Sequence, residues 1–247
     1  MSVPPFARGR AVLMRCHAMR TAILEDDANQ ARVLERWLTE AGHDCHTFDS
    51  GKELVRNLGR ETYDLLLLDW NIPDMNGTEV LAWVRTSLRS TVPVIFVTAQ
   101  HSENAIVEAL SSGADDYLVK PVRRRELVAR ALAVYRRAHS EALSEAAFEL
   151  SPYRFDLKAR RAEVQGRVVE LTDKEFDLAL FLFRECGRVL SRGHLLERIW
   201  GRNANIVTRT VDTHMSRLRT KLDLGAQNGV RLSSVYSYGY RLEKIDG

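Results

Sequence analysis

Three acidic side chains follow two short apolar runs in the first half of the sequence. Glu25 and Asp26 come after the run TAIL, and Asp69 comes after LLLL. If these runs are neighbouring parallel strands, their carboxyl ends meet at the edge of the sheet where such folds bind ligands. Clustered carboxylates repel one another unless a cation joins them, and an all-oxygen ligand set favours a hard ion such as Mg²⁺. The sequence therefore predicts a magnesium site.

Two further polar side chains end apolar runs later in this half. Thr98 supplies a hydroxyl and Lys120 supplies an ammonium. A carboxylate nucleophile beside a metal, a hydroxyl and a cation can accept a phosphoryl group, because the cations neutralise charge on its oxygens. Each residue alone has a simpler interpretation: Asp69 as a helix cap, Thr98 as a structural hydroxyl, Lys120 as a solvated lysine. Their joint placement at four strand ends favours the functional interpretation.

The elements that must position these side chains alternate between strands and amphipathic helices. Nearly continuous apolar strands indicate burial on both faces, which is typical of a parallel sheet covered by helices. We expect a five-stranded, doubly wound α/β domain, with a first helix over 28–41 closed by Gly42 and a last helix over 123–137. The expected strands are 21–24, 45–48, 65–68, 94–97 and 117–119.

Residues 21–137 resemble a receiver domain, a flavodoxin-like fold. The stretches AILEDD, LLLLDWNIPDMNG, VIFVTA and GADDYLVKP carry this resemblance. It implies phosphorylation on Asp69, and a cis peptide bond between Lys120 and Pro121. It also implies a Mg²⁺ site made by Glu25, Asp26, Asp69 and the carbonyl of Asn71, with Thr98 and Lys120 contacting the phosphoryl oxygens and Tyr117 acting as an aromatic switch. From the residues alone, Tyr117 would be a core side chain.

The second half of the sequence has a different organisation. Residues 148–171 alternate apolar and polar side chains and predict a small antiparallel sheet. Thr172 and Glu175 form a capping box that begins a helix ending near Gly187. Further helices are expected from Ser191 to Trp200 and over 210–222, followed by a hairpin over 230–242. Three helices followed by a terminal hairpin, which is called the wing, predict a winged helix-turn-helix.

The third of these helices has two different faces. Its apolar stripe packs on a core, and the stripe comprises Val211, Met215, Leu218 and Leu222. The opposite face carries small hydroxyls and arginine, which suit a major groove because Arg bridges guanine N7 and O6. This polar face comprises Thr213, Ser216, Arg217 and Thr220, flanked by Arg209, Thr210, Arg219 and Lys221. An ordinary solvated helix face is the alternative interpretation.

Residues 148–247 are similar to the effector domain of OmpR/PhoB-type regulators. The stretches LTDKEFDLALFLF, GRVLSRGHLLERIWG, RTVDTHMSRLRTKL and YGYRL carry this similarity. It implies base contact by Arg217 beside Thr210 and Thr213. It also implies phosphate and sugar contacts by Arg209, Arg219 and Trp200, and a surface for RNA polymerase at 201–208. Tyr236 and Ser237 stand where many members carry a wing arginine, so the wing is expected to contact phosphates rather than the minor groove.

The receiver resemblance further implies dimerisation on phosphorylation, through a face crossed by charged pairs. Asp116 with Arg130, and Asp115 with Arg137, stand at matching positions. A third pair would join Glu126 to a basic residue near position 106, where this sequence has Ile106. Since exposed ion pairs contribute only about 0–1 kcal/mol each, we expect the homodimer to form without it.

Composition agrees with two domains. The 247 residues include 45% apolar side chains, enough for two cores. Residues 19–147 carry 15 Lys/Arg and 20 Asp/Glu, whereas 148–247 carry 18 and 13, so the second half is the one suited to a polyanion. The expected order is a disordered extension over 1–18, a receiver over 19–138, a linker over 139–147 and a winged-helix domain over 148–247. Three scattered cysteines and the absence of a membrane-length apolar run favour a cytoplasmic protein.

Together these observations predict a phosphorylation-controlled DNA-binding transcription regulator of a two-component system, which is not an enzyme. Its expected partners are a sensor histidine kinase, promoter double-stranded DNA, RNA polymerase and a second copy of itself, without a membrane. One alternative is an aspartate-based phosphatase, but such enzymes carry a second Asp where this chain has Asn71. Another is a constitutive DNA-binding protein with an inert receiver, which the complete acidic pocket argues against.

Overall fold

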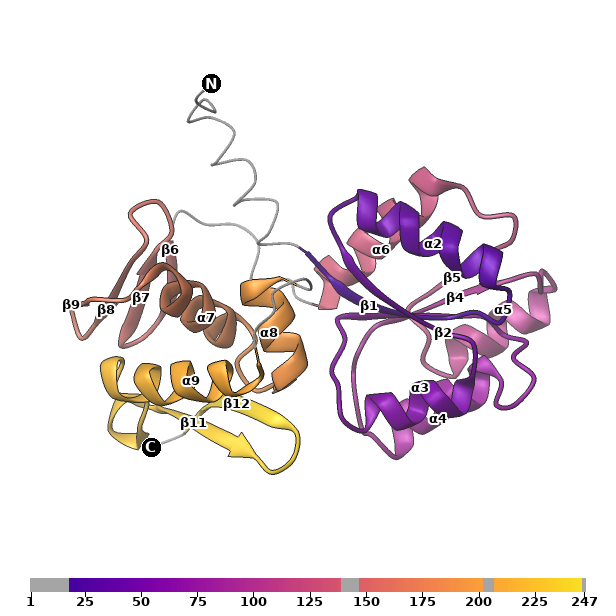
Figure 1. Cartoon of the computed structure of the whole chain (residues 1–247). Coiled ribbons are helices and arrows are strands. Elements are labelled where there is room, and N and C mark those ends of the chain that lie inside the picture. The colour runs from indigo at the N-terminus through magenta and orange to yellow at the C-terminus, as the bar shows by residue number, and fades with distance from the viewer. Residues whose placement is uncertain (1–17, 139–146, 202–206, 246–247) are drawn as a thin grey trace, which may run out of the picture. The chain divides into compact units, whose positions relative to one another are not determined.

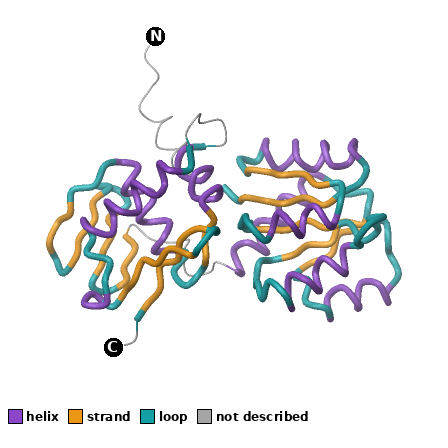
Figure 2. Tube along the Cα trace, turned by 60° about the horizontal axis from the view of Figure 1, so that its bottom comes forward, coloured by secondary structure: helices purple, strands orange, loops and turns teal. Residues whose placement is uncertain are grey.

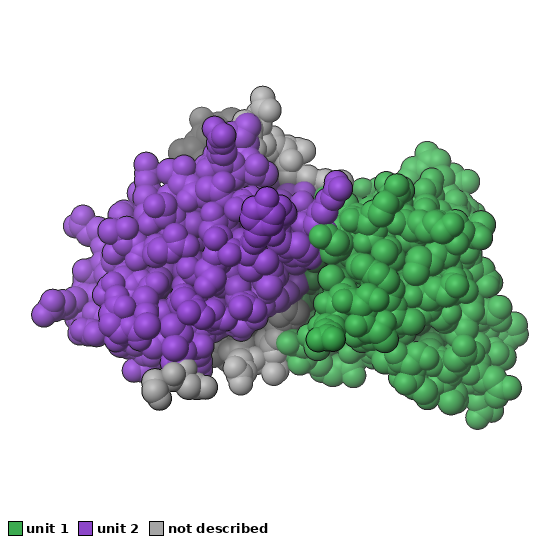
Figure 3. Space-filling model, turned by 90° about the horizontal axis from the view of Figure 1, so that it is seen from below, with its two compact units in different colours: residues 1–59, 63–138 green, residues 60–62, 139–247 purple. Residues whose placement is uncertain are grey.

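The chain forms two compact units, residues 1–59 with 63–138 and residues 60–62 with 139–247 (Figure 3). The computed structural model describes residues 18–138, 147–201 and 207–245. Three regions named in the sequence analysis lie wholly or mostly outside these residues. They are the N-terminal extension that was expected to be disordered, the expected linker, and the loop expected to contact RNA polymerase. Among the helices of the described ranges, none combines the length and the apolar character that crossing a bilayer requires.

The first unit is built on a five-stranded parallel sheet in the order β2-β1-β3-β4-β5 (Figure 1). This is the flavodoxin-like order expected from the sequence, and β1 and β3 lie side by side at its centre. β1, β3 and β4 are buried along their whole length, as their apolar runs predict. The strands are β1 (Arg20–Leu24), β2 (Asp44–Phe48), β3 (Leu65–Leu68), β4 (Val94–Thr98) and β5 (Asp116–Val119).

Helices of the described ranges cover both faces of this sheet (Figures 1 and 2). They are α2 (Ala28–Glu40), α3 (Gly51–Leu58), α4 (Gly77–Thr86), α5 (Glu103–Ser111) and α6 (Arg124–Ala138). α2 and α6 pack their apolar stripes on one face, through residues such as Leu38 and Leu127. α3, α4 and α5 cover the other, through residues such as Leu54, Val80 and Ala109. The fold is therefore the doubly wound domain that the alternating pattern predicts.

Local sequence signals begin these helices at the edge of the sheet where the acidic residues lie. Asp27 accepts hydrogen bonds from the backbone N–H groups of the first turn of α2. Ser50 caps α3 in the same way, and Asn76 forms a capping box with Glu79 at the start of α4. Such caps satisfy backbone donors that lack a partner within the helix, so each loop leaves its strand and enters the next helix at a defined residue.

The second unit begins with a four-stranded antiparallel sheet, β6-β7-β8-β9. These strands are β6 (Ala147–Leu150), β7 (Tyr153–Asp156), β8 (Arg161–Val164) and β9 (Arg167–Val169). After it come α7 (Asp173–Arg184), β10 (Val189–Ser191), α8 (Arg192–Trp200), α9 (Arg209–Lys221), the 3-10 turn η2 (Ala226–Asn228), β11 (Val230–Val235) and β12 (Gly239–Lys244). Ala147, which the sequence assigned to the linker, instead pairs with Asp156 as the first residue of β6.

A single apolar core joins the three helices to both sheets of the second unit. The capping box at Thr172 and Glu175 begins α7 as predicted, and Ser191 caps α8. The predicted stripe of α9, from Val211 to Leu222, is buried in this core. β10 was not expected from the sequence; it extends the terminal hairpin to a three-stranded sheet of order β10-β12-β11. The result is a winged helix-turn-helix.

Candidate functional site

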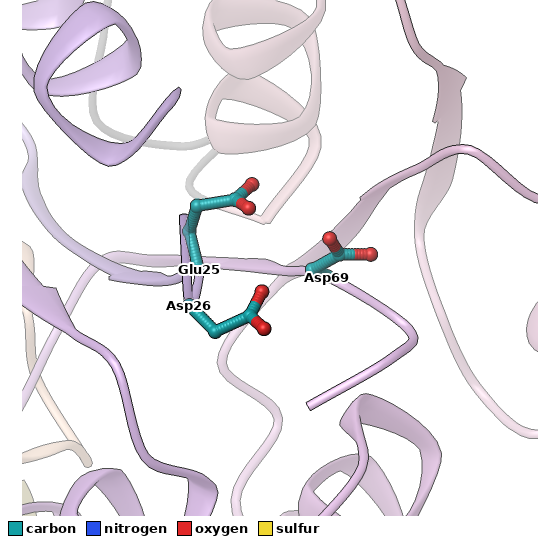
Figure 4. Close-up of side chains that lie close together, drawn as sticks. All are labelled: Glu25, Asp26 and Asp69. Carbon is teal, nitrogen blue, oxygen red and sulfur yellow. The ribbon is translucent and has the colours of Figure 1, made fainter. Parts of the chain in front are cut away.

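The carboxyl ends of the strands of the first unit bring the predicted acidic residues together. Glu25 and Asp26 follow β1, and Asp69 follows β3, the strand that pairs with it. One carboxylate oxygen from each of the three lies within 4.8 Å of the other two (Figure 4). Thr98 ends β4 and Lys120 follows β5, so five predicted residues share one edge of the sheet.

Lys120 reaches across this edge to two of the carboxylates. Its Nζ lies 2.6 Å from Oδ2 of Asp69 and 2.7 Å from Oε2 of Glu25. Burial raises the pKa of Glu25, and the hydrogen bond from Lys120 offsets this only in part. Burial also acts to lower the pKa of Lys120, but the hydrogen bonds to Asp69 and Glu25 outweigh it and raise that pKa. The ammonium therefore stays charged where a phosphoryl group would need a cation.

The acidic cluster fits a divalent cation. In the part of the chain that the structure describes, Oε1 of Glu25 is buried and has no hydrogen-bond partner. A buried carboxylate oxygen in this state is a strong acceptor without a donor. Asp69 is buried, but Asp26 beside it is exposed, which gives the cluster one open side. Oxygen-only ligands with access for water suit Mg²⁺, which keeps several of its waters.

The loop between β3 and α4 is fastened at both ends. The N–H of Trp70 donates to Oδ1 of Asp69 at 2.6 Å. At the far end, Asp74 accepts hydrogen bonds from Oγ of Ser50 at 2.7 Å and from the backbone N–H groups of Gly51 and Lys52 at 3.0 and 3.1 Å. Asp74 was not predicted as a site residue, because its partners lie in a segment far from it in sequence.

The same loop depends on Gly51 and Gly77. A Cβ on Gly51 would lie 2.2 Å from the carbonyl oxygen of Met75, and one on Gly77 would lie 2.1 Å from that of Asp69. Larger residues at either position would push the backbone apart. Asn71 lies in this loop and is exposed. The clamp by Asp74 and the two close approaches thus fix the backbone that carries Asn71.

Thr98 and Tyr117 occupy the side of the site formed by β4 and β5. Thr98 is fully buried. The Tyr117 ring packs against Phe96 with centroids 6.2 Å apart, and its hydroxyl donates to the carbonyl of Gln100 at 2.9 Å. Burial raises the pKa of Tyr117. The Lys120–Pro121 peptide bond is cis, as the resemblance implied. Tyr117 is thus partly a core residue, as its sequence alone suggested, with a hydroxyl bonded beside the site.

The charged residues of the expected dimer face lie on α6, at the start of β5 and just before it. Arg130 bonds both carboxylate oxygens of Asp116 at 3.2 Å and pairs with Glu126 at 3.1 Å, within the chain. The Asp115 carboxylate pairs with Arg85 at 3.3 Å, and Arg137 donates to the Asp115 backbone carbonyl at 3.3 Å. Arg85 was not anticipated; it also donates to three backbone carbonyls near this face.

In the second unit, α9 turns the predicted polar face outward. Thr213, Ser216, Arg217 and Thr220 are exposed, and so is Arg209 at the start of the helix. Thr210 is half-buried. Over the described ranges, neither the Arg209 nor the Arg217 side chain makes a hydrogen bond or an ion pair, so both guanidinium groups have all their donors available. Small hydroxyls and arginine on an exposed face suit contact with a major groove.

Three of the residues expected at DNA contact other elements of the domain. Nζ of Lys221 donates to Glu175 at 2.8 Å and to the carbonyl of Glu170 at 3.1 Å. The Arg219 guanidinium donates to the carbonyl of Leu232. Trp200 is half-buried and packs its ring edge-on against His214, with centroids 5.0 Å apart. Their sequence positions did not reveal these partners.

Comparisons with known proteins agree with this architecture. Residues 21–132 match the family described as "Response regulator receiver domain", and residues 166–242 match "Transcriptional regulatory protein, C terminal". The sensory transduction protein RegX3 of Mycobacterium tuberculosis is 40% identical over 90% of this chain and 97% of its own length. The transcriptional regulatory protein PrrA of the same organism is 38% identical over 83% and 88%.

Among solved structures, the Thermotoga maritima response regulator DrrB, described as an OmpR/PhoB homolog, is 25% identical. The match covers 92% of this chain and 99% of DrrB, with a TM-score of 0.44.

Proposed function

Since this chain belongs to the OmpR/PhoB family of two-component response regulators, we propose that Asp69 is the residue that accepts the phosphoryl group from a sensor histidine kinase. Regulators of this family control transcription in response to phosphorylation. The observation that carries the assignment is the position of Asp69: its carboxylate lies beside those of Glu25 and Asp26 and 2.6 Å from the Lys120 ammonium. Among the described residues, these three form the one such acidic cluster.

We propose that Glu25, Asp26, Asp69 and the carbonyl of Asn71 hold Mg²⁺, which when bound supplies positive charge to the phosphoryl oxygens. Thr98 and Lys120 contact the same oxygens from β4 and β5. Lys120 then exchanges its contact with Asp69 for one with the transferred group. The Tyr117 hydroxyl bonds the carbonyl of Gln100, whose N–H donates to the Thr98 hydroxyl. A movement of Thr98 toward the phosphoryl group therefore also changes the surroundings of that ring.

We propose that α9 enters the major groove of promoter DNA with its exposed face. Arg217 contacts a base, Thr210, Thr213, Ser216 and Thr220 line the contact, and Arg209 contacts a phosphate. Trp200 contacts the sugar-phosphate backbone. The support is the exposure of this face and the two arginines whose donors are available there. The segment 201–208, which lies largely outside the described residues, is proposed as the surface for RNA polymerase.

Phosphorylation is proposed to join two copies through the face that carries Asp115, Asp116, Glu126, Arg130 and Arg137, in the cytoplasm. Pairing places two effector domains on adjacent half-sites. Each domain then raises the effective concentration of the other at the DNA, so affinity increases without new base contacts.

The proposal for Asp69 is tested with acetyl phosphate and Mg²⁺. Intact-mass spectrometry of the parent protein should show one added phosphoryl group, which disappears on chelation of Mg²⁺. Asp69→Ala should show none. Asp49→Ala is a matched control, because Asp49 directly follows β2 at the same edge but lies outside the acidic cluster. A phosphoryl group that is still added to Asp69→Ala rules out the assignment of Asp69. Rapid release of inorganic phosphate by the parent would favour a phosphatase instead.

A further inference from the structure

Arg219 forms a bidentate contact with the backbone of the wing. Its Nε and Nη2 donate to the carbonyl oxygen of Leu232 at 3.3 and 3.0 Å. Leu232 lies in β11, the edge strand of the sheet β10-β12-β11. An edge strand has one side without a strand partner, and its outward carbonyls need other donors.

The register of the hairpin shows that the carbonyl of Leu232 is one of these outward carbonyls. Ile245 N–H donates to the carbonyl of Gly229 at 3.0 Å, just beyond the paired residues of β11 and β12. In an antiparallel ladder, hydrogen-bonded and non-hydrogen-bonded pairs alternate along the strand. Leu232 pairs with Leu242, three pairs along from Gly229, which is a non-hydrogen-bonded position. Its carbonyl therefore points away from β12, and Arg219 supplies the donors that no strand provides.

A second contact joins α9 to the other strand of the wing. Oδ1 of Asp212 accepts a hydrogen bond from the Tyr240 hydroxyl at 2.7 Å and one from Nε of Arg192 at 2.9 Å. Tyr240 lies in β12. Asp212 and Arg219 are seven residues apart, about two helical turns, and so lie on the same side of α9. The helix is thus fastened to β11 at one point and to β12 at another.

These contacts divide the cations of α9 into two sets. All four are exposed, but Arg219 and Lys221 bond to groups of their own domain, whereas the side chains of Arg209 and Arg217 make no hydrogen bond or ion pair among the described residues. The wing turn adds no cation, because the segment 235–240 reads VYSYGY. Tyr236 at this turn is 96% exposed. The contacts of Arg219 and Asp212 with the two wing strands add to the buried core and to the β10–β12 pairing that also hold the wing.

We propose that Arg219 is a positioning residue that holds the wing against α9, and that it does not contact a DNA phosphate. This inference rests on the proposed function of α9 as the DNA-reading helix. It replaces the expectation from the sequence, in which Arg219 neutralises a phosphate. A phosphate contact contributes to the salt dependence of binding, and a positioning contact inside the protein does not.

The first test measures binding of the full chain to a fluorescent duplex that the parent protein has selected from a random-sequence pool. Affinity is followed as a function of salt concentration for the parent, Arg219→Ala, Arg219→Gln, Arg209→Ala and Arg217→Ala. Removing one phosphate contact lowers the slope of log K against log salt by about 0.9. We expect that decrease for Arg209→Ala. Both Arg219 variants should bind more weakly with the slope of the parent.

The second test needs no DNA. Hydrogen exchange of β11 and β12 amides in the full chain should become about tenfold faster in Arg219→Ala, since a local opening costs less when Arg219 no longer holds Leu232. The exchange should stay unchanged in Arg209→Ala, and protection of α7 should persist in every variant, which shows that the domain is folded. Arg219→Gln, which keeps an amide donor, should lie between Arg219→Ala and the parent.

A decrease of the salt slope in the Arg219 variants overturns the proposal, whatever happens to exchange in the wing. Parent-like exchange in Arg219→Ala overturns it too, because the wing would then not depend on this contact. If Arg209→Ala and Arg217→Ala leave both affinity and slope unchanged, the failure lies instead with α9 as the DNA-reading helix. The two ideas are therefore separated by the same set of variants.

Discussion

Lys120 Nζ bridges Asp69 and Glu25, at 2.6 and 2.7 Å from their carboxylate oxygens. This contact places one cation among three acidic side chains, where it offsets part of their mutual repulsion. A divalent ion at the same cluster would be repelled by the ammonium and attracted by the carboxylates. Lys120 therefore has opposite effects on the two ligands proposed for the site, the metal and the phosphoryl group.

Lys120→Met should strengthen Mg²⁺ binding and weaken phosphorylation. Removing a unit charge a few ångströms from the cation raises metal affinity by about tenfold, as Coulomb interactions in a partly solvated site predict. The yield of aspartyl phosphate should fall, because the transferred oxygens lose their cation. Calorimetric titration with Mg²⁺ and intact-mass measurement of phosphorylation check the two halves. Weaker Mg²⁺ binding in Lys120→Met would show that the ammonium does not oppose the metal.

Asp74 should make the free energy of unfolding of the first unit depend on pH in the acidic range. The hydrogen bond from Ser50 is the main cause that lowers the pKa of Asp74 to about 2, from 3.8. A carboxyl whose pKa is lowered by folding stabilises the fold above its ordinary pKa, and the effect disappears as the pH falls through the folded value. The extra stability of the parent over Asp74→Asn should therefore be constant above about pH 5 and shrink between about pH 4 and 2.

Urea denaturation of the full chain at a series of pH values checks this prediction. The matched variant Ser50→Ala removes the same hydrogen bond from its donor side. Like Asp74→Asn, it should reduce the loss of stability that the parent shows as the pH falls. A difference between parent and Asp74→Asn that stays constant down to about pH 2 would show that the carboxylate form of Asp74 does not stabilise the loop.

Arg217→Ala should reduce sequence discrimination. Loss of a bidentate guanine contact costs about 1–3 kcal/mol and relaxes specificity at one base pair. Arg209→Ala should instead weaken binding to all sequences about equally, because a phosphate carries no sequence information. Binding to a panel of single-base variants of the selected duplex distinguishes the two patterns. If both variants lose affinity by the same factor for every duplex of the panel, Arg217 and Arg209 do not differ as base and phosphate contacts.

Lys221 should stabilise the second unit. Its Nζ donates to Glu175, which is 1% exposed and also accepts from Thr172. Lys221→Met leaves this buried carboxylate with fewer partners, and we expect a loss of about 1–3 kcal/mol. The double variant Lys221→Met with Glu175→Gln should recover part of the loss, because a neutral amide is less costly to bury. Hydrogen exchange of α7 and α9 in the full chain measures both. If the amides of α7 and α9 exchange as slowly in Lys221→Met as in the parent, Lys221 does not stabilise the second unit.

Arg130→Glu should prevent dimer formation while leaving Asp69 able to accept a phosphoryl group. The substitution turns two attractions, with Asp116 and Glu126, into repulsions. Sedimentation with beryllofluoride and Mg²⁺ at tens of micromolar protein, roughly the range in which weak interfaces assemble, should show a dimeric parent and a monomeric variant.

Arg124→Glu is the matched control for this experiment. Arg124 lies on the same helix but pairs with Glu40 of α2, so the variant should still dimerise. A parent protein that remains monomeric with the phosphoryl mimic would rule out activation through dimerisation.

The sequence by itself determined the parts of this protein that depend on local periodicity and on strand ends. The apolar runs before Asp26 and Asp69 predict buried parallel strands, and parallel strands bring their ends to one edge. The capping box of Thr172 and Glu175 and the stripe of α9 were likewise readable, because neighbours along a helix interact through a fixed spacing.

Only the tertiary structure decided which partner each polar side chain takes. Asp74 bonds the start of α3, and Arg219 bonds the carbonyl of Leu232. Every residue offers a backbone carbonyl, and every residue except proline an N–H, so sequence patterns cannot single out the one that folding brings within reach of a long side chain. For the same reason, the sequence could place Arg217 and Arg219 on one helix but not show that Arg219 bonds the carbonyl of Leu232 while the Arg217 side chain has no such partner among the described residues.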